Sequence, residues 1–189
     1  MKIYRSLKPN ITSQTFGIEG TQKNMLPQYQ AIGLKFGHDG WDWVCPDGEP
    51  IYWDGGGKGL VIQQSTDPNV GLGVVVYTSD KDGQFKHIFW HFKEIKCKVG
   101  QEVESGDLLG LADSTGFSTG SHLHRGLKMC DGNYNTIDHD NGYFGAIDLK
   151  PYFINIYVKD YVATLKSQVD MLSQILAGLK KLFESLKGR

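Results

Sequence analysis

The sequence lacks a charge imbalance, a long apolar run and a leader-like start, and each absence excludes a class of protein. Its 20 lysines and arginines nearly balance its 21 aspartates and glutamates, so no overall field favours nucleic acid or another polyanion. The chain contains no run of ~20 apolar residues, which a membrane-spanning helix requires, and residues 1–9 lack the apolar core of a secretory signal. We therefore expect no nucleic-acid partner, no transmembrane segment, and synthesis in the cytoplasm without a signal peptide.

Cysteine is scarce as well. Cys45, Cys97 and Cys130 make an odd number without a CxxC spacing, so neither a disulfide framework nor a thiolate zinc site is indicated. We predict buried free thiols, in preference to the alternative that Cys45, three residues after Asp42, is a metal ligand.

Glycine, in contrast, is abundant, with 24 residues, many of them in turn-forming pairs that favour numerous short strands. No repeat of 20–50 residues is visible. Four successive regions differ in pattern: an irregular start (1–37) with a short helix near 26–31, strand-like runs (37–129), a polar loop (131–145) and an apolar segment (151–158). The pattern predicts a mainly antiparallel β domain over residues 1–158, with its core at about 37–153.

Four histidines lie in three short clusters whose spacing is informative. In an extended chain, side chains two residues apart point to the same face. His38 and Asp42 therefore converge, and Gly40 between them leaves room for an ion. The same period places His122 and His124 together on one face of a strand.

The residue types in these clusters fit a catalytic metal centre. Neutral imidazole and carboxylate are ligands that zinc prefers, and three protein ligands with an open fourth position are typical of a catalytic site. Zinc lowers the pKa of water to about 7 and polarises a carbonyl group. The remaining histidines, including His91 at the end of an aromatic strand, would then handle protons and a developing oxyanion. Each pair alone is weak evidence, because a histidine on a strand is more often structural.

The surrounding motifs make the combination specific. Residues 99–110 read VGQEVESGDLLG, and they lead through STGFSTGS at 114–121 into HLH at 122–124. Upstream lie HDGWD at 38–42 and FWH at 89–91. The chain resembles the lysostaphin/LytM-type zinc metallopeptidases, whose sequences read V-x-x-G-x-x-V-x-x-G-x-x-[IL]-G, then TG-x-STG-x-HLH, with H-x-G-x-D and [YF]-x-H upstream. The motifs occur in the order typical of that family, over about residues 16–153.

This resemblance implies a fold, a reaction and a set of roles. The fold is the antiparallel β-sheet groove fold of that family, and the reaction is hydrolysis of peptide bonds in the stem or cross-bridge peptides of bacterial peptidoglycan. His38, Asp42 and His124 are implied as ligands of one Zn2+ per chain. His91 and His122 are implied as the non-ligating catalytic histidines, near the attacking water and the substrate carbonyl.

Some positions depart from the family or lie outside its motifs. Arg125 and Gly126 replace the usual aromatic residue and Glu, so we expect one wall of the cleft to differ. Phe89 occupies a position that is often Tyr, which removes a hydroxyl that would contact substrate. We interpret His87 as structural or cleft-lining, on the same strand face as His91. A loop at residues 138–142 superficially resembles a calcium site, but it lacks ligands and is better explained as a solvated turn.

From Asp160 onward the apolar residues follow a helical period. Written as heptads, apolar residues occupy every a and d position: Val162, Leu165, Val169, Leu172, Leu176, Leu179, Phe183 and Leu186. Lysines line one flank, while Ile175 and Leu182 widen the stripe on the other. We predict that residues 159–189 form an amphipathic helix and that 160–189 join copies of the chain in a coiled coil. The alternatives are packing back on the β domain and docking on a membrane surface.

The functional prediction is a zinc metalloendopeptidase that lyses cell walls. A phage- or prophage-type lysin, released by lysis or carried on a virion, suits the composition better than a secreted autolysin. The rival class is a non-catalytic peptidoglycan-binding or assembly protein that the C-terminal helix oligomerises. The presence of all five histidine and aspartate residues favours the enzyme, and the sequence leaves open which bond and which organism's wall are attacked.

Overall fold

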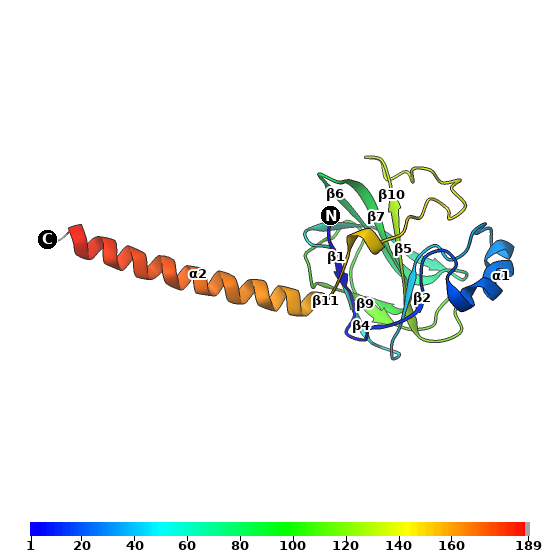
Figure 1. Cartoon of the computed structure of the whole chain (residues 1–189), viewed down its shortest axis with the longest axis horizontal. Helices are drawn as coiled ribbons and strands as arrows, with labels where there is room; N and C mark the ends of the chain where they lie inside the picture. Colours follow the sequence, from blue (N-terminus) through cyan, green and yellow to red (C-terminus); the bar gives the residue numbers. More distant parts are fainter. Residues whose placement is uncertain (188–189) are drawn as a thin grey trace.

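Glycine-rich turns divide most of the chain into short strands in the computed structural model, which describes residues 1–187 (Figure 1). The main sheet has nine strands within these residues: β2 (Ile11–Gln14), β3 (Trp41–Val44), β4 (Pro50–Tyr52), β5 (Gly59–Asp67), β6 (Gly71–Asp80), β7 (Gly83–Ile95), β8 (Glu102–Val103), β9 (Leu108–Ala112) and β10 (His122–Met129). A parallel pair, β1 (Ile3–Arg5) and β11 (Phe153–Tyr157), forms a second sheet. The helical elements are η1 (Gly20–Met25), α1 (Leu26–Ala31), η2 (Lys150–Tyr152) and α2 (Val158–Lys187).

The main sheet runs in the order β2-β3-β10-β7-β6-β5-β8, with β4 paired to β9 and β9 paired also to β7. All of these neighbours are antiparallel, so the predicted mainly antiparallel β fold with a C-terminal helix is confirmed. The first 37 residues are less irregular than expected. They contribute β1 and β2 as well as the predicted short helix α1, because β1 pairs with β11 at the far end of the domain, which no local pattern reveals.

The central strands present one face to the core and the other to the candidate site. Leu123 and Leu127 of β10 are fully buried, and since side chains alternate along a strand, His122 and His124 lie on the opposite face. Burial of each large apolar side chain contributes ~1.5–3 kcal/mol. The core therefore fixes the strands from which the site is built. Its largest members include Trp43, Trp53, Phe85, Phe89 and Phe92.

Arg125 and Phe89 belong to this core, which corrects the expectation that they border the cleft. Arg125 and Asp54 are both 0% exposed and form a two-point ion pair, with Nε–Oδ2 and Nη2–Oδ1 distances of 2.9 Å. The guanidinium also lies 4.3 Å from the centre of the Phe89 ring. A charge tolerates such burial only when it is paired and hydrogen-bonded. Gly126 does lie on the site side, where a Cβ atom would stand 3.5 Å from Nε2 of His124.

His87 also lies in the core, so the prediction that it shares a face with His91 is wrong. Its Nδ1 accepts a hydrogen bond from Arg125 at 2.7 Å, and its Nε2 donates one to Oγ1 of Thr78 at 2.9 Å. Burial, and then the charge of Arg125, hold the pKa of His87 well below its usual value. The alternation fails because the pairing of β6 with β7 is irregular near His91, whose φ of 68° is left-handed.

Helix α2 extends away from the β domain over most of its length (Figure 1). Only its start is attached: Val158 is buried, and the ring of Tyr161 stacks on Tyr4 with centroids 4.0 Å apart. The structure therefore does not show the alternative in which the helix packs back on the domain. Among residues 1–187, no helix is long and apolar enough to cross a membrane.

Candidate metal centre

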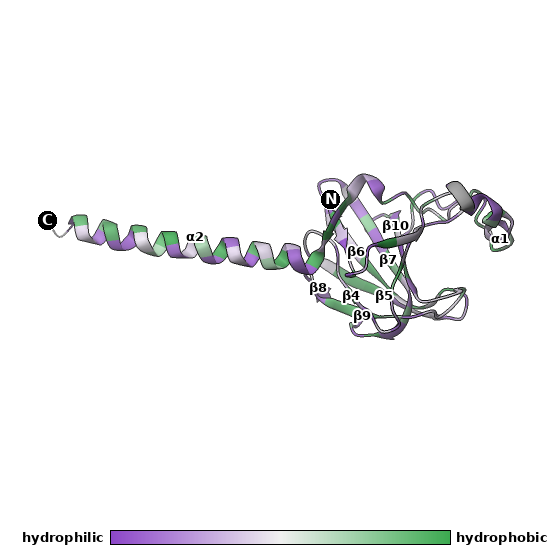
Figure 2. Ribbon diagram, turned by 60° about the horizontal axis from the view of Figure 1, so that its bottom comes forward, coloured by the Kyte–Doolittle hydropathy of each residue, from purple (hydrophilic) through white to green (hydrophobic). Residues whose placement is uncertain are grey.

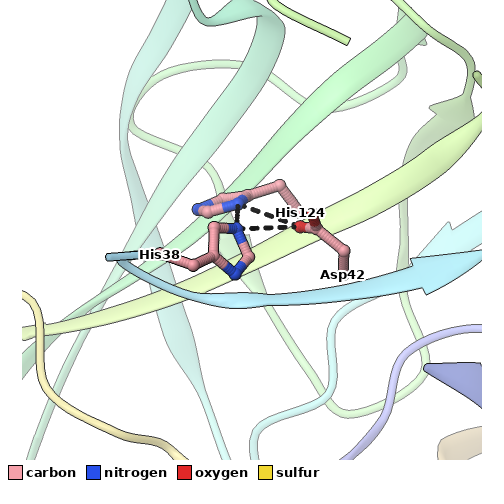
Figure 3. A group of neighbouring side chains, drawn as sticks. All are labelled: His38, Asp42 and His124. Atoms are coloured by element: carbon pink, nitrogen blue, oxygen red, sulfur yellow. Dashed lines mark hydrogen bonds and ion pairs between the residues drawn. The ribbon is translucent and has the colours of Figure 1, made fainter. Parts of the chain in front are cut away.

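His38, Asp42 and His124 converge in the way that the strand period predicted (Figure 3). Asp42 of β3 and His124 of β10 are direct cross-strand partners, and His38 precedes β3. Nε2 of His38 lies 3.0 Å from Nδ1 of His124, and Oδ1 of Asp42 lies 3.2 Å and 3.1 Å from these two nitrogens. All three residues are buried, and their ligand atoms lie within 4.8 Å of one another. Three converging donors of these types form a site that can hold a metal ion.

Gly40 makes this convergence sterically feasible. A Cβ atom at position 40 would lie 2.6 Å from Cε1 of His124 and 2.8 Å from the carbonyl oxygen of Arg125. The sequence indicated Gly40 as the residue that leaves room at the site. The structure shows that the room is taken by the imidazole ring of His124.

The charges at the centre favour a bound cation. Burial raises the pKa of Asp42, but the charge of His38 and hydrogen bonds from His124 and His38 outweigh burial and hold this pKa far below its usual range. Burial lowers the pKa of His38, but the Asp42 carboxylate outweighs it, so the net pKa of His38 is raised. An ionised carboxylate between two imidazole nitrogens is a donor set that fits zinc.

A backbone carbonyl fixes the orientation of the first ligand. Nδ1 of His38 donates a hydrogen bond to the carbonyl oxygen of Thr15 at 3.2 Å, which turns Nε2 toward the centre. His124 presents Nδ1 instead, and its Nε2 faces Oδ1 of Asp39 at 3.8 Å.

His91 stands beside the centre on a strained turn of the backbone. Its Nδ1 donates to the carbonyl oxygen of Thr115 at 2.6 Å, which leaves Nε2 as the unprotonated nitrogen. Burial, followed by the nearby charges of His124 and His122, lowers the pKa of His91 to about 4. His91 is therefore neutral at pH 7 and able to accept a proton.

His122 completes the group and is more exposed than the other four residues. Its Nδ1 donates to the carbonyl oxygen of Gly120 at 2.7 Å, with Oγ of Ser118 at 3.2 Å. Its ring centroid is 4.5 Å from that of His91, and its Nε2 is 3.6 Å from Oδ2 of Asp42. The structure thus brings together all five residues that the sequence singled out.

Other candidate residues lie apart from the centre. Within residues 1–187, the His38, Asp42 and His124 group is the only set of His, Cys, Asp or Glu side chains spaced for a metal ion. Cys45 is not part of it; burial raises the pKa of this thiol to about 11, and all three cysteines are buried and free, as predicted. His139 lies in an exposed loop beside Asp140.

Sequence reasoning missed the groups that orient these histidines. They are backbone carbonyls of Thr15, Thr115 and Gly120, together with the carboxylate of Asp39. A carbonyl oxygen carries no residue signature, so only the folded path of the chain shows it.

The fold and the site together define a β-sheet protein with a three-ligand metal centre flanked by two histidines, the arrangement of a metal-dependent hydrolase. The chain belongs to peptidase family M23, whose model matches residues 36–136. The resemblance found in the sequence is therefore confirmed.

Several relatives share part of this domain. The chain is 36% identical over 101 residues to peptidoglycan DD-endopeptidase ShyB of Vibrio cholerae, covering 53% of this chain and 22% of ShyB. It is 32% identical over 94 residues to lysostaphin of Staphylococcus simulans, covering 49% and 18%. The catalytic domain of that lysostaphin superposes with a TM-score of 0.56 at 20% identity, covering 77% of this chain and 91% of that domain. The prophage-encoded M23 protein EnpA of Enterococcus faecalis gives 0.50 at 22%, covering 71% and 96%. The chain spans about a fifth of the length of these two curated relatives.

Proposed function

We propose that this protein is a zinc metalloendopeptidase that hydrolyses a peptide bond in the stem or cross-bridge peptides of bacterial peptidoglycan. The observation that carries the proposal is the convergence of the His38, Asp42 and His124 ligands with His91 and His122 on one face of the sheet. Membership of family M23 and the names of its relatives, which include a peptidoglycan DD-endopeptidase, point to the same substrate class.

Zinc held by the three ligands supplies Lewis acidity, which activates water and polarises the scissile carbonyl. The protein residues supply proton transfer and orientation. His91 is held neutral, with Nε2 turned to the centre, so it accepts the proton of the attacking water and passes it to the leaving amine. His122 lies closer to solvent and is placed to donate a hydrogen bond to the carbonyl oxygen as negative charge develops there.

The decisive experiment digests purified cell walls with the zinc-loaded protein and weighs the released fragments. Walls with glycine cross-bridges and walls with direct cross-links should be compared, because the masses then identify the bond. His124→Ala should lose both zinc, measured by elemental analysis, and activity. His139→Ala, in the exposed loop, is the matched control and should keep both.

The two non-ligating histidines separate catalysis from binding. His91→Ala and His122→Ala should retain zinc and the fold but lose activity by ~10²–10⁴, the range for removing a proton-transfer group or an oxyanion donor. Loss of zinc in either variant would show that ligand and catalyst are assigned wrongly. Wall binding without released fragments in the parent protein would favour the rival function, a peptidoglycan-binding or assembly module.

We also propose two features of the setting. The first is a phage- or prophage-type lysin, in line with the prophage-encoded structural neighbour; lysis of intact cells by added protein, compared with lysis from within, tests it. The second is a homo-oligomer joined through residues 160–189. Its support is the exposed apolar stripe on α2, of which residues up to 187 are described.

A further inference from the structure

Helix α2 exposes an apolar surface that the β domain does not cover (Figure 2). Seven of the eight side chains at heptad positions a and d are 41–61% exposed: Leu165, Val169, Leu172, Leu176, Leu179, Phe183 and Leu186. Burial of each such side chain is worth ~1.5–3 kcal/mol. A helix of 30 residues that left all of them in water would give up far more free energy than a domain has to spare.

The attachment of the helix excludes its own domain as the cover. Val158 is fully buried, Lys159 donates to the carbonyl oxygen of Gly106 at 3.3 Å, and Tyr161 stacks on Tyr4. These contacts fix the direction in which α2 leaves the domain (Figure 1). The stripe would reach the β domain only if this junction were broken.

The charges on α2 favour protein over lipid as the cover. Helices that lie on membranes carry a polar face rich in lysine and arginine. The polar face of α2 instead includes Asp170, Gln174 and Glu184 with its lysines, and Glu184 approaches Lys187 at 3.8 Å. This mixed, partly neutral face is typical of the outside of a helical bundle.

The width of the stripe indicates more than two helices. Ile175 and Leu182 lie at g positions and Met171 at a c position, and all three are 51–56% exposed. Around a helix, g adjoins d and c adjoins g, so the apolar arc is wider than the a/d seam of a two-stranded coiled coil.

The lysines indicate the direction in which the helices run. Lys166, Lys180 and Lys187 all occupy e positions. In an antiparallel pair e faces e, which would place Lys166 against Lys180 or Lys187 of the other copy. In a parallel bundle e faces g, so Lys180 and Lys187 instead lay their alkyl stems over Ile175 and Leu182.

We infer that α2 is the stalk of a parallel homo-oligomer of three or more copies, with all the β domains gathered at its amino-terminal end. This inference rests on the proposed function in one respect only: several clefts carried at one end would bind an insoluble wall at several points. The effective concentration of the second cleft then exceeds that of a free domain.

A cysteine scan tests the direction on the full chain, whose own cysteines are buried. Leu165→Cys and Phe183→Cys, each oxidised alone, should form interchain disulfides, because like positions face each other in a parallel bundle. Disulfides that appear only when the two variants are mixed would mean an antiparallel bundle and would overturn the inference.

Light scattering tests assembly with a charge-matched pair of variants. Leu172→Glu with Leu179→Glu should give monomers, whereas Ser167→Glu with Gln174→Glu, on the outer face, should leave three or more copies together. A monomeric parent chain would overturn the inference, whether or not it then binds anionic lipid vesicles.

Activity completes the test. The monomeric variant should keep its rate on a soluble peptide substrate and lose about tenfold or more on intact walls. Equal loss on both substrates would overturn the multivalent role. Absence of activity in all forms, with disulfides still formed, would refute the proposed function and leave the stalk intact.

Discussion

Replacing Asp54 by Asn should destabilise the β domain by about 3–5 kcal/mol, because it leaves the guanidinium of Arg125 buried without its counter-charge. Both side chains are 0% exposed, and the carboxylate accepts from Nε and Nη2 at 2.9 Å each. An asparagine retains one acceptor oxygen and turns an NH₂ group toward a donor. The other partners of Arg125, His87 and the ring of Phe89, are uncharged or aromatic and do not replace the lost charge.

The magnitude is large on the scale of a domain, whose total stability is about 5–15 kcal/mol. Urea unfolding followed by tryptophan fluorescence measures it, with Asp47→Asn as the matched control. Asp47 pairs with Lys93 at 3.0 Å, but these side chains are 55% and 52% exposed, so its loss should cost less than about 1 kcal/mol.

The double variant of Asp54→Asn with Arg125→Leu should recover much of the loss, because it also removes the uncompensated charge. If Asp54→Asn differed from Asp47→Asn by less than about 1 kcal/mol, the buried pair would not be holding the core together. The same conclusion would follow if the double variant were no more stable than the single one.

Two other predictions concern the site and its surroundings. Gly40→Ala should weaken zinc binding at least tenfold in a competition titration, because its Cβ would stand 2.6 Å from the His124 ring; Gly57→Ala, with open space around it, should bind normally. Stability should fall below about pH 6.5, since unfolded His87 then takes up a proton that the folded side chain refuses, at up to about 1.4 kcal/mol per pH unit. In urea titrations at pH 7 and pH 5, His87→Gln should show a smaller difference than the parent, and an equal difference would contradict the assignment.

Strand alternation predicted most of the site. It placed His38 with Asp42 and His122 with His124 from their spacing alone, because a period of two needs no knowledge of distant partners. The same alternation puts Arg125 in the core. The sequence argument assigned it to the cleft, since arginine is almost never fully buried unless paired, and its partner Asp54 lies 71 residues away in the sequence.

Departures from alternation account for the rest. A bulge is a local backbone event, so nothing in the sequence around His91 announced its left-handed φ or the separation of its face from that of His87. The helical period of α2 was clear from Asp160 onward, and the helix begins at Val158. That it leaves the domain instead of packing on it depends on the junction with Tyr4, more than 150 residues earlier in the chain.

Three of the five site histidine and aspartate side chains are held by carbonyl oxygens, those of Thr15, Thr115 and Gly120. A carbonyl is present whatever side chain the residue carries. The loops that border the cleft are therefore free to exchange side chains, and with them substrate preference, without altering which nitrogen of each histidine bears a proton. For a peptidase facing walls of varied chemistry, recognition can drift while the proton chemistry stays fixed.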